Sequence, residues 1–462
     1  MVKVNVSPLQ DRRYRHLFSA QVISLFGTGL TTVALALLAH QVAGGRAGEV
    51  LGIALALKMV AYVFVAPLIG SYAQQLPRRT LLVSLDLLRA SAVLALPFIT
   101  AVWQIYCLVF LLNVFSAGFT PVFQATIPDI IQDKQQYDRA LSFSRLAYDL
   151  ENLLSPTIAA MLIALMSFNA LFVLNAVAFV ASALLVVSVV LPGQSPDHGS
   201  TFWHRAKQGM RIYLRTPRLQ GLLALCLGVA AVGSMQIVNT VVYVRTYLGL
   251  DDTWVAIALA AAGGGSMSAA LLIPKALQKV SERSLMLVGG AVMAAAVLLG
   301  TLQPDIAGLM VLWLLTGFGS SLVQTPVGRL LIRSCHEPDR PAVFAAQFSL
   351  SHACWLVAYP LAGWIGANLG LVAAFAVMGA IALASALVAV MLWPPREPDS
   401  LKHVHVAMDH SHLHYHDEHH QHAHEGWEGP EPHSHPHHHA PMKHRHRLVI
   451  DEHHPDWPVR QR

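Results

Sequence analysis

Nineteen of the 25 histidines in this chain lie in one C-terminal stretch, residues 403–454, where Asp and Glu residues are interleaved with them. Neutral imidazole is a good ligand for borderline divalent metals such as Ni, Co, Cu and Zn, and short His-rich tracts are typical of metal binding. The alternatives are a solvated polar tail or a purification tag, although a tag would be one uninterrupted run. The candidate metal ligands are His403, His405, His410, His412, His414, His416, His419, His420, His422, His424, His433, His435, His437, His438 and His439.

The carboxylates of Asp149 and Glu151 form a second set of candidate functional residues, because they lie in an apolar stretch, residues 140–166. A charge inside a membrane costs at least about 2.5–3.5 kcal/mol, so each one requires a reason. Arg145 precedes Asp149 by four residues on the same helix face, so a structural ion pair explains Asp149. Glu151 lies on another face and has no such local cation. Both carboxylates are candidates for proton coupling, with Glu151 the stronger one.

His352 and Cys354 lie in another apolar stretch, residues 342–369. Imidazole, thiolate and carboxylate all bind transition metals, so these two residues and Glu151 form a candidate metal site within the membrane. A carboxylate and an imidazole could share a divalent cation or couple its movement to a proton. In the competing interpretation, His352 is a neutral histidine bonded to a neighbouring carbonyl, and Cys354 is a small packing residue.

Apolar stretches of membrane-spanning length must position these residues. The chain of 462 residues is 55% apolar and only 12% charged, with a mean hydropathy of +0.50. Stretches of about 20 apolar residues can cross a hydrocarbon core of about 30 Å, which predicts an all-α membrane protein. The predicted spans are 17–42, 50–73, 81–100, 105–126, 140–166, 170–191, 219–244, 254–277, 285–302, 306–331, 342–369 and 371–393. The run 17–42 is too long for a cleaved signal peptide.

Charge and cysteine usage exclude several classes of function. The net charge of +5 includes no Lys/Arg block with interleaved aromatic residues, so we expect no nucleic-acid partner. The Gly-x-x-x-x-Gly-Lys-[Ser/Thr] loop is absent, so we expect no ATP drive. The four cysteines are scattered and form no Cys-x-x-Cys motif, which predicts isolated reduced thiols.

Lysine and arginine concentrate in the connections that follow the even-numbered spans, which predicts that both termini are cytoplasmic. Residues 192–217 divide the spans six and six, and their basic and apolar residues alternate at helical spacing, so we expect an amphipathic helix there. The predicted regions are a cytoplasmic N-terminus (1–16), a six-helix half (17–191), a central cytoplasmic loop (192–217), a second six-helix half (218–393) and a disordered, cytoplasmic His-rich tail (394–462).

The two halves contain matching motifs in the same order. Thr120-Pro121-Val122 corresponds to Thr325-Pro326-Val327, and Asp138-Arg139 corresponds to Asp339-Arg340. Parallel six-helix repeats of this kind are a transporter architecture. With the Asp-Arg motifs as the register mark, the halves are offset by 339 − 138 = 201 residues, so Glu151 corresponds to His352. We therefore expect these two residues at equivalent depth.

Twelve spans, two halves and a charged central loop resemble the major facilitator superfamily. The family's second loop typically reads Gly-x-x-x-Asp-Arg-x-Gly-Arg-Arg, and residues 70–79 keep only Gly70, Arg78 and Arg79 as gating-loop residues, with Gln74 and Gln75 in place of the Asp and Arg. The resemblance therefore implies a weakened gating charge network. The His-rich C-terminus, with the segments 144–152 and 347–355, resembles the nickel-resistance exporters of this superfamily.

The resemblance implies a secondary transporter, not an enzyme, that exports nickel and possibly cobalt by proton antiport and confers metal resistance. The expected partners are metal ions, protons and the lipid bilayer, and the expected form is a monomeric, multi-pass protein of the inner (plasma) membrane. We expect no prosthetic group, and Ni or Co as cargo or bound to the tail. The main alternative is an exporter of an organic molecule, such as a drug or siderophore, with a metal-responsive regulatory tail. A membrane-anchored metal sensor or buffer is the third class.

Overall fold

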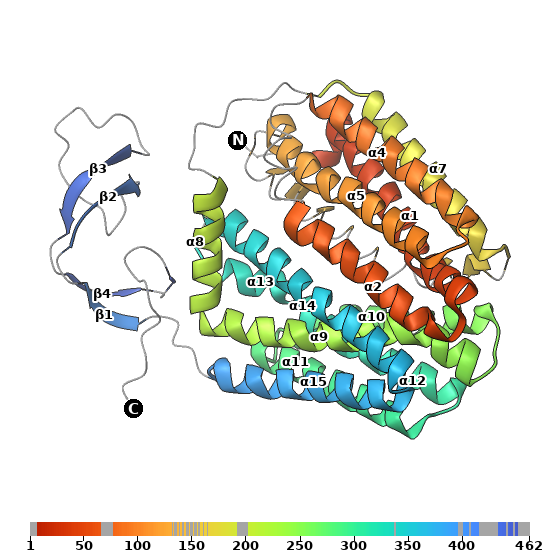
Figure 1. The fold of residues 1–462 in the computed structure, drawn as a ribbon. Helices are drawn as coiled ribbons and strands as arrows, with labels where there is room; N and C mark the ends of the chain where they lie inside the picture. Colours follow the sequence, from red (N-terminus) through yellow and green to blue (C-terminus); the bar gives the residue numbers. More distant parts are fainter. Residues whose placement is uncertain are drawn as a thin grey trace.

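The computed structural model describes most of the membrane part and short pieces of the tail. The described residues are 7–65, 77–131, 202–336 and 339–395, most of 161–191, short pieces and single residues between 133 and 159, and the tail residues 401–405, 408–414, 433–439, 442–446 and 449–450. Over these residues the membrane part consists of helices joined by turns and short loops (Figure 1).

Most of the helices are apolar around their whole circumference, because each one faces either lipid or another helix. Polar caps mark several of their ends: the Asp305 side chain, for example, accepts a hydrogen bond from the Gly308 backbone N–H over 2.9 Å. The helices are α1 (Arg12–Ala43), α2 (Ala47–Val60), α4 (Arg78–Ala95), α5 (Val102–Ile130), α7 (Phe168–Val187), α8 (Phe202–Arg215), α9 (Pro217–Val241), α10 (Asp252–Ala276), α11 (Glu282–Leu299), α12 (Ile306–Gln324), α13 (Val327–Ile332), α14 (Arg340–Asn368) and α15 (Leu371–Leu392). Two helices continue into π-helical turns, η3 (Ala61–Val65) after α2 and η6 (Val242–Tyr247) after α9.

Ten helical segments of the described chain are long and apolar enough to cross a membrane. One of them, Arg12–Val65, contains the predicted span 17–42 and the described part of the span 50–73, because the turn between α1 and α2 is short and helical. The ten segments account for every predicted span except 140–166, most of which lies outside the described residues. The chain is therefore a multi-pass membrane protein whose membrane part is built from helices.

The helices form two groups that follow the two halves of the sequence. In Figure 1 the red-to-yellow helices α1 to α7 lie on one side and the green-to-blue helices α9 to α15 on the other. Within the first group α7 packs on α1 and α4, and within the second α12 packs on α10 and α11 while α15 packs on α9. The main contact between the groups is α2 against α14.

The buried apolar residues show that the two halves are joined at one end and separate at the other. One large hydrophobic cluster includes α1 and α2 residues of the first half, such as Leu38 and Leu51, together with residues of the second half. At the end where α8 lies, the first half has a separate cluster around Phe123. A small cluster around Ile273 belongs to the second half alone. We call the joined end the outer end and the α8 end the inner end, as names for the two ends of the molecule.

Glycines allow the α2 and α14 backbones to approach each other at the outer end. A Cβ atom on Gly52 would stand 2.5 Å from the carbonyl oxygen of Tyr359, which is far below an ordinary contact. A Cβ atom on Gly363 would stand 3.0 Å from the Glu49 Cα. Only glycine fits at these two positions without moving a helix. The outer closure is therefore a backbone-to-backbone contact between the halves.

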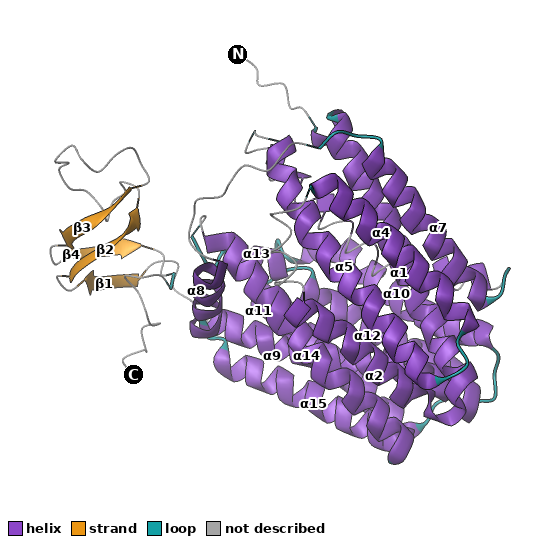
Figure 2. Cartoon of the chain, turned by 45° about the horizontal axis from the view of Figure 1, so that its top comes forward, coloured by secondary structure: helices purple, strands orange, loops and turns teal. Residues whose placement is uncertain are grey.

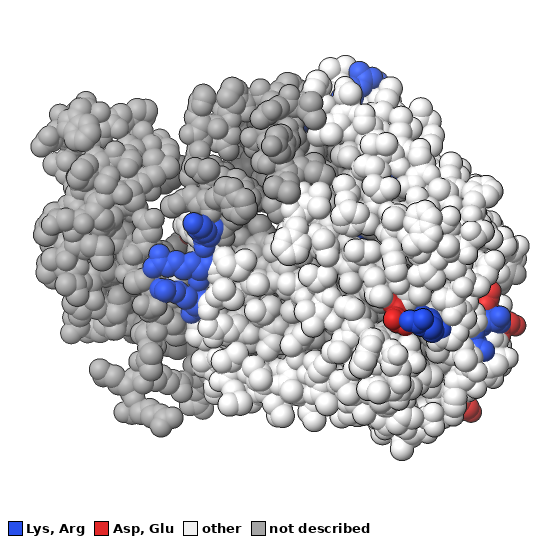
Figure 3. Space-filling view, viewed as in Figure 1, with Lys and Arg blue, Asp and Glu red and all other residues white. Residues whose placement is uncertain are grey.

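The predicted amphipathic helix of the central loop is present as α8, and it packs against protein. Ile212 and Tyr213 are buried, and the Tyr213 hydroxyl donates a hydrogen bond to Oε1 of Gln347 on α14. The Gln208 side-chain amide donates to Asp339 over 2.7 Å. The opposite side of α8 carries exposed basic residues, and Figure 3 shows Lys and Arg side chains gathered there. α8 is thus attached to the second half by way of α14.

The structure describes four short strands within the His-rich tail. Strand β1 (Leu401–His405) pairs antiparallel with β4 (Met442–His446), and β2 (Met408–His414) pairs antiparallel with β3 (His433–His439). The alternating His-x-His pattern has the two-residue period of a strand, a periodicity that the prediction did not use. Figure 2 shows the strands apart from the helices, beyond α8.

The tail contacts the helical body again after the strands. Val449 and Ile450 are 5% and 0% exposed, and they belong to the same hydrophobic cluster as the α8 residues Ile212 and Tyr213. Trp393, directly after α15, is 3% exposed in that cluster as well. The chain between Trp393 and Val449 therefore leaves and rejoins the same apolar core.

Candidate functional site

A Lys–Glu pair lies within the membrane-spanning part of the first half. Lys58 is in the last turn of α2, and Glu151 lies on the segment between α5 and α7. The two side chains attract each other electrostatically. A lone charge at this depth would cost at least about 2.5–3.5 kcal/mol, and an opposite charge offsets part of that cost. Glu151 therefore has a cation partner, and that partner comes from another helix.

A close approach of α1 holds Glu151 in this position. A Cβ atom on Gly29 would stand 3.0 Å from Oε1 of Glu151 and would overlap the side chain of Ser155. Gly29 therefore leaves the room in which the segment carrying Glu151 packs against α1. Any larger residue at position 29 would overlap Ser155 and shift the segment that carries Glu151.

Aromatic rings cover the pair on the side of the second half. Lys58 Nζ lies 5.7 Å from the ring centroid of Tyr62, which is in the π-helical turn η3. The Tyr62 ring meets the rings of His352 and Phe348 of α14 edge-on, at centroid distances of 5.6 and 6.2 Å. π-Helical turns inside α-helices are frequent at functional sites. We call five residues the half-interface cluster: Lys58, Tyr62, Glu151, Phe348 and His352. All five side chains are partly or fully exposed.

One nitrogen of His352 is already occupied. Its Nδ1 donates a hydrogen bond to the carbonyl oxygen of Phe348 over 2.7 Å, and its ring lies 4.0 Å from that of Phe348, centroid to centroid. This geometry matches the competing interpretation of a neutral histidine bonded to a neighbouring carbonyl. Only Nε2 remains free to accept a hydrogen bond from a ligand. Lys58 also interacts electrostatically with His352, so the lysine is the charge common to both residues.

The structure does not bring the three candidate intramembrane metal ligands together. Cys354 interacts with Cys226 of α9 and Tyr213 of α8, which are not part of the half-interface cluster. Residues two apart on a helix point in nearly opposite directions, so His352 and Cys354 cannot share the cluster. The described residues contain no group of three or more His, Cys, Asp or Glu that could hold a metal ion.

Other predicted site residues fall partly outside the described chain. Asp149 and Gly70 lie outside it, as do the tail histidines His416, His419, His420, His422 and His424. Arg78 opens α4, and the Arg79 guanidinium donates a hydrogen bond to the carbonyl of Val187, the last residue of α7. The remaining histidines of the predicted tail set lie on the three strands β1, β2 and β3.

Two ionic contacts stabilise the inner parts of the halves. In the first half, buried Arg89 pairs with buried Asp86, which also accepts a hydrogen bond from Ser182 over 2.7 Å. In the second half, Glu282 at the start of α11 pairs with Arg329 over 3.1 Å and Arg333 over 3.4 Å. The three-residue spacing of Asp86 and Arg89 is visible in the sequence, whereas Glu282 precedes Arg329 and Arg333 by about 50 residues, a distance at which sequence spacing indicates no pairing.

Comparison with known proteins identifies the family. The sequence profile of the Major Facilitator Superfamily matches residues 17–283 and 223–414. The uncharacterized MFS-type transporter YfiS of Bacillus subtilis is 25% identical over 395 residues, which cover 81% of this chain and 92% of that protein. Macrolide efflux protein A of Streptococcus pyogenes is 22% identical over 221 residues, or 46% of this chain and 53% of that protein.

Solved structures share the fold at low sequence identity. A mutant of the nucleoside transporter NupG superposes with a TM-score of 0.65 at 9% identity, covering 82% of this chain and 100% of that chain. A bacterial homologue of the human lysosomal transporter Spinster, in an inward-facing and unoccupied conformation, gives 0.61 at 12% identity and covers 83% and 96%. The paired helical groups, the contact of α2 with α14 and the profile match agree, and the chain belongs to the major facilitator superfamily of transporters.

Proposed function

We propose that this protein exports an organic molecule with apolar or aromatic rings, and that Glu151 couples export to a proton. The observation that carries the proposal is the half-interface cluster, in which one Lys–Glu pair is covered by the rings of Tyr62, Phe348 and His352. Ligand sites are typically lined by apolar and aromatic groups with few polar ones. The part-length similarity to macrolide efflux proteins supports the direction of transport.

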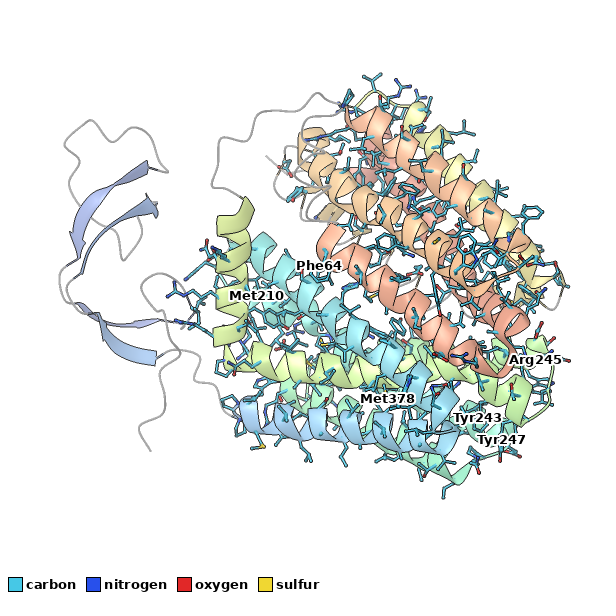
Figure 4. All side chains as sticks on the ribbon, in the orientation of Figure 1. Phe64, Met210, Tyr243, Arg245, Tyr247 and Met378 are labelled. Atoms are coloured by element: carbon cyan, nitrogen blue, oxygen red, sulfur yellow. The ribbon has the colours of Figure 1, made fainter. Side chains whose placement is uncertain are left out.

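The arrangement of the halves supports alternating access around this cluster. The halves share a core at the outer end, and the first half has a core of its own at the inner end, so a molecule would enter from the α8 side. The exposed basic face of α8 supports a cytoplasmic position for that side, by the positive-inside rule. Phe64 belongs to η3, the π-helical turn that follows α2, and Figure 4 places it on the side nearest to α8. Its side chain is 58% exposed.

The proposed coupling uses the Lys58–Glu151 attraction. While Glu151 is ionised, it attracts Lys58 on α2, the helix that forms the contact between the halves. Protonation of Glu151 removes this attraction and leaves the Lys58 ammonium next to the Tyr62 ring. A proton that binds from outside and leaves to the inside would thereby alternate the position of α2 and drive the export of the organic molecule.

Export of nickel or cobalt is the second candidate, and the tail histidines are the observation that favours it. The described membrane residues offer Nε2 of His352 and a carboxylate that is already paired with lysine, which is a poor ligand set for a divalent cation. We therefore assign the tail a regulatory role and the membrane cluster the organic cargo.

Reconstituted transport separates the two candidates. Full-length protein in liposomes with an imposed pH gradient is given a macrolide or Ni²⁺, and proton movement is followed with an entrapped pH-sensitive dye. We expect the macrolide to cause protons to cross the membrane down the pH gradient, which changes the dye signal. We expect Ni²⁺ to leave the dye signal unchanged. Proton release with Ni²⁺ alone would establish the second candidate and refute the first.

Glu151→Gln is the matched test of the coupling residue. It keeps the side-chain shape but cannot be ionised, so proton-coupled transport should be lost while the protein remains folded. The control is Glu49→Gln, because Glu49 forms an ion pair with exposed Arg46 at the outer end over 2.7 Å. Normal coupling in Glu151→Gln would contradict the assignment of Glu151 and leave the choice of cargo to the transport assay.

A further inference from the structure

Helix α1 packs lengthwise against the segment 140–155, whose described residues are helical. The Tyr14 hydroxyl of α1 donates a hydrogen bond to the Ala140 carbonyl over 3.0 Å. At the other end of the contact, a Cβ atom on Gly29 would overlap the Ser155 side chain. Both pairs have the same offset in sequence, 140 − 14 = 155 − 29 = 126, so the two helices run parallel and in register. We call this contact the α1 seam.

One face of α1 forms the seam. Residues seven or eight apart return to the same side of a helix, so Gln21 lies on the same face as the two α1 residues of these contacts. The common offset places Gln21 opposite Ala147, which is small and buried. The Phe18 ring is on this face as well, and its centroid lies 6.0 Å from that of the Phe143 ring. The seam is therefore continuous over this length of α1.

Two buried polar atoms of the seam have no hydrogen-bond partner among the described residues, Oε1 of Gln21 and Oγ of Ser155. Buried polar atoms are nearly always paired with protein or with an ordered water, and such a water makes about three hydrogen bonds. The small Ala147 leaves room for a water beside the Gln21 amide. Glu151 is four residues from the level of Ala147, or about 6 Å along the helix axis, which two hydrogen bonds through one water can span.

We propose that the α1 seam carries the proton between Glu151 and the inner end of the protein, along a short chain of ordered waters. This inference rests on the proposed function, in which Glu151 gives up a proton to the inside. The O–H bond of the Glu151 carboxyl breaks, and the proton passes to the water at Gln21, which gives a proton to the next group inward. The electron pair stays on the carboxylate, which then attracts Lys58 again. Gln21 is a positioning residue, because its amide oxygen accepts a hydrogen bond from the water and does not take the proton itself.

The inner part of the seam continues the polar chain. Ser144 is three residues before the level of Ala147, about 4.5 Å nearer the inner end, and its hydroxyl interacts with that of Tyr14. A serine hydroxyl both accepts and donates hydrogen bonds, so it can pass a proton on. Tyr14 is in the first turn of α1 and belongs to the hydrophobic cluster at the inner end. On the side of the second half the Tyr62 ring lies next to the Lys58 ammonium, so the seam is the more polar route inward.

Exchange of the Glu151 carboxyl proton for deuterium tests the seam without any cargo. Full-length protein in liposomes is transferred from H₂O to D₂O at acidic pH, and the shift of the carboxyl C=O band is followed by infrared difference spectroscopy against Glu151→Gln. Gln21→Leu removes the oxygen that would hold the water and keeps a similar volume. We expect it to slow the exchange about tenfold, because one buried hydrogen bond to the water is lost from the path. Ala147→Val keeps Gln21 but fills the space opposite it, and it should slow the exchange as well.

Asn175→Leu is the matched control. Asn175 of α7 also has a buried amide oxygen without a partner among the described residues, and its amide N–H donates to Thr31 over 2.6 Å. Thr31 is two residues from Gly29, so it points about 200° away from the seam. We expect this variant to exchange at the wild-type rate, and thermal unfolding checks that all the variants are folded.

Equal exchange rates in wild type and the two seam variants, or equal slowing in the α7 control, would refute the seam whatever the cargo is. The proposed function fails by a different result, the absence of macrolide-driven proton movement in wild type. The two failures are therefore distinguishable.

Discussion

Replacing Gly52 with alanine should open the outer end of the protein. The added methyl group would stand 2.5 Å from the Tyr359 carbonyl oxygen, whereas ordinary contacts begin at 3.4 Å, so α2 and α14 must separate by 3.4 − 2.5 = 0.9 Å locally. Alanine is a better helix former than glycine by about 1 kcal/mol, so local helix stability cannot explain a loss. Any destabilisation of the closed state therefore comes from the contact between the halves.

The size of the effect follows from the lost packing. A gap of about 0.5–1 Å removes a quarter to a half of the dispersion energy of each contact across it. Overpacking of this kind typically costs about 1–3 kcal/mol, which shifts an equilibrium between two states by about 5- to 150-fold. We expect the population with separated outer ends to rise by a factor in this range.

Spin-label distances across the outer end measure this population. Phe98 and Leu302 lie at the outer ends of different halves and are 82% and 76% exposed, so they can carry labels after replacement with cysteine in a background without the native cysteines. Gly264→Ala in α10 is the matched control, because a Cβ atom there has no neighbour within 4 Å. An unchanged distance distribution in Gly52→Ala would refute the idea that the α2–α14 contact closes the outer end.

Three further predictions concern stability, and thermal unfolding in detergent measures each of them. Asp86→Ala leaves the Arg89 guanidinium buried without its carboxylate, so we expect a loss of about 3–5 kcal/mol; a loss below about 1 kcal/mol would contradict the pairing. Asp305→Ala removes the N-terminal cap of α12 and should lower the free energy of unfolding by about 1 kcal/mol. An unchanged stability would show that water replaces the cap. Burial raises the pKa of Tyr213 well above its ordinary value, so its hydroxyl stays protonated in the folded protein and its bond to Gln347 persists at neutral pH. The stability that Tyr213 contributes is full below its unfolded pKa of about 10 and is lost as the pH rises further, so wild type should fall relative to Tyr213→Phe only above about pH 10.

The spans and the division into halves were predictable because they depend on local properties of the chain. A membrane span requires about 20 apolar residues, and the central loop interrupts the series with charged residues. Several helix boundaries were also local, since caps such as Asp305 precede the apolar runs. The strands of the tail could have been predicted from the alternation of histidines with other residues, which has the period of a strand.

The partners across the half interface could not be predicted in the same way. The internal repeat suggested that Glu151 and His352 belong to equivalent segments, but equal depth does not determine which side chains meet. Lys58, about 90 residues before Glu151, is the charge that acts on both. Helix geometry alone could have excluded a joint site of His352 and Cys354, because residues two apart point about 200° from each other.

Val449 and Ile450 give the tail a second point of attachment. Complete burial of such side chains stabilises a contact by about 1.5–3 kcal/mol each, so the far end of the tail is held as well as its start at Trp393. The chain between these two points is attached at both ends to the core that also contains α8 residues. It cannot diffuse away as a free end would. A change that stiffens the chain between Trp393 and Val449 would therefore pull on the core at both attachment points. Because α8 packs on α14, the pull would reach the helix that contacts α2.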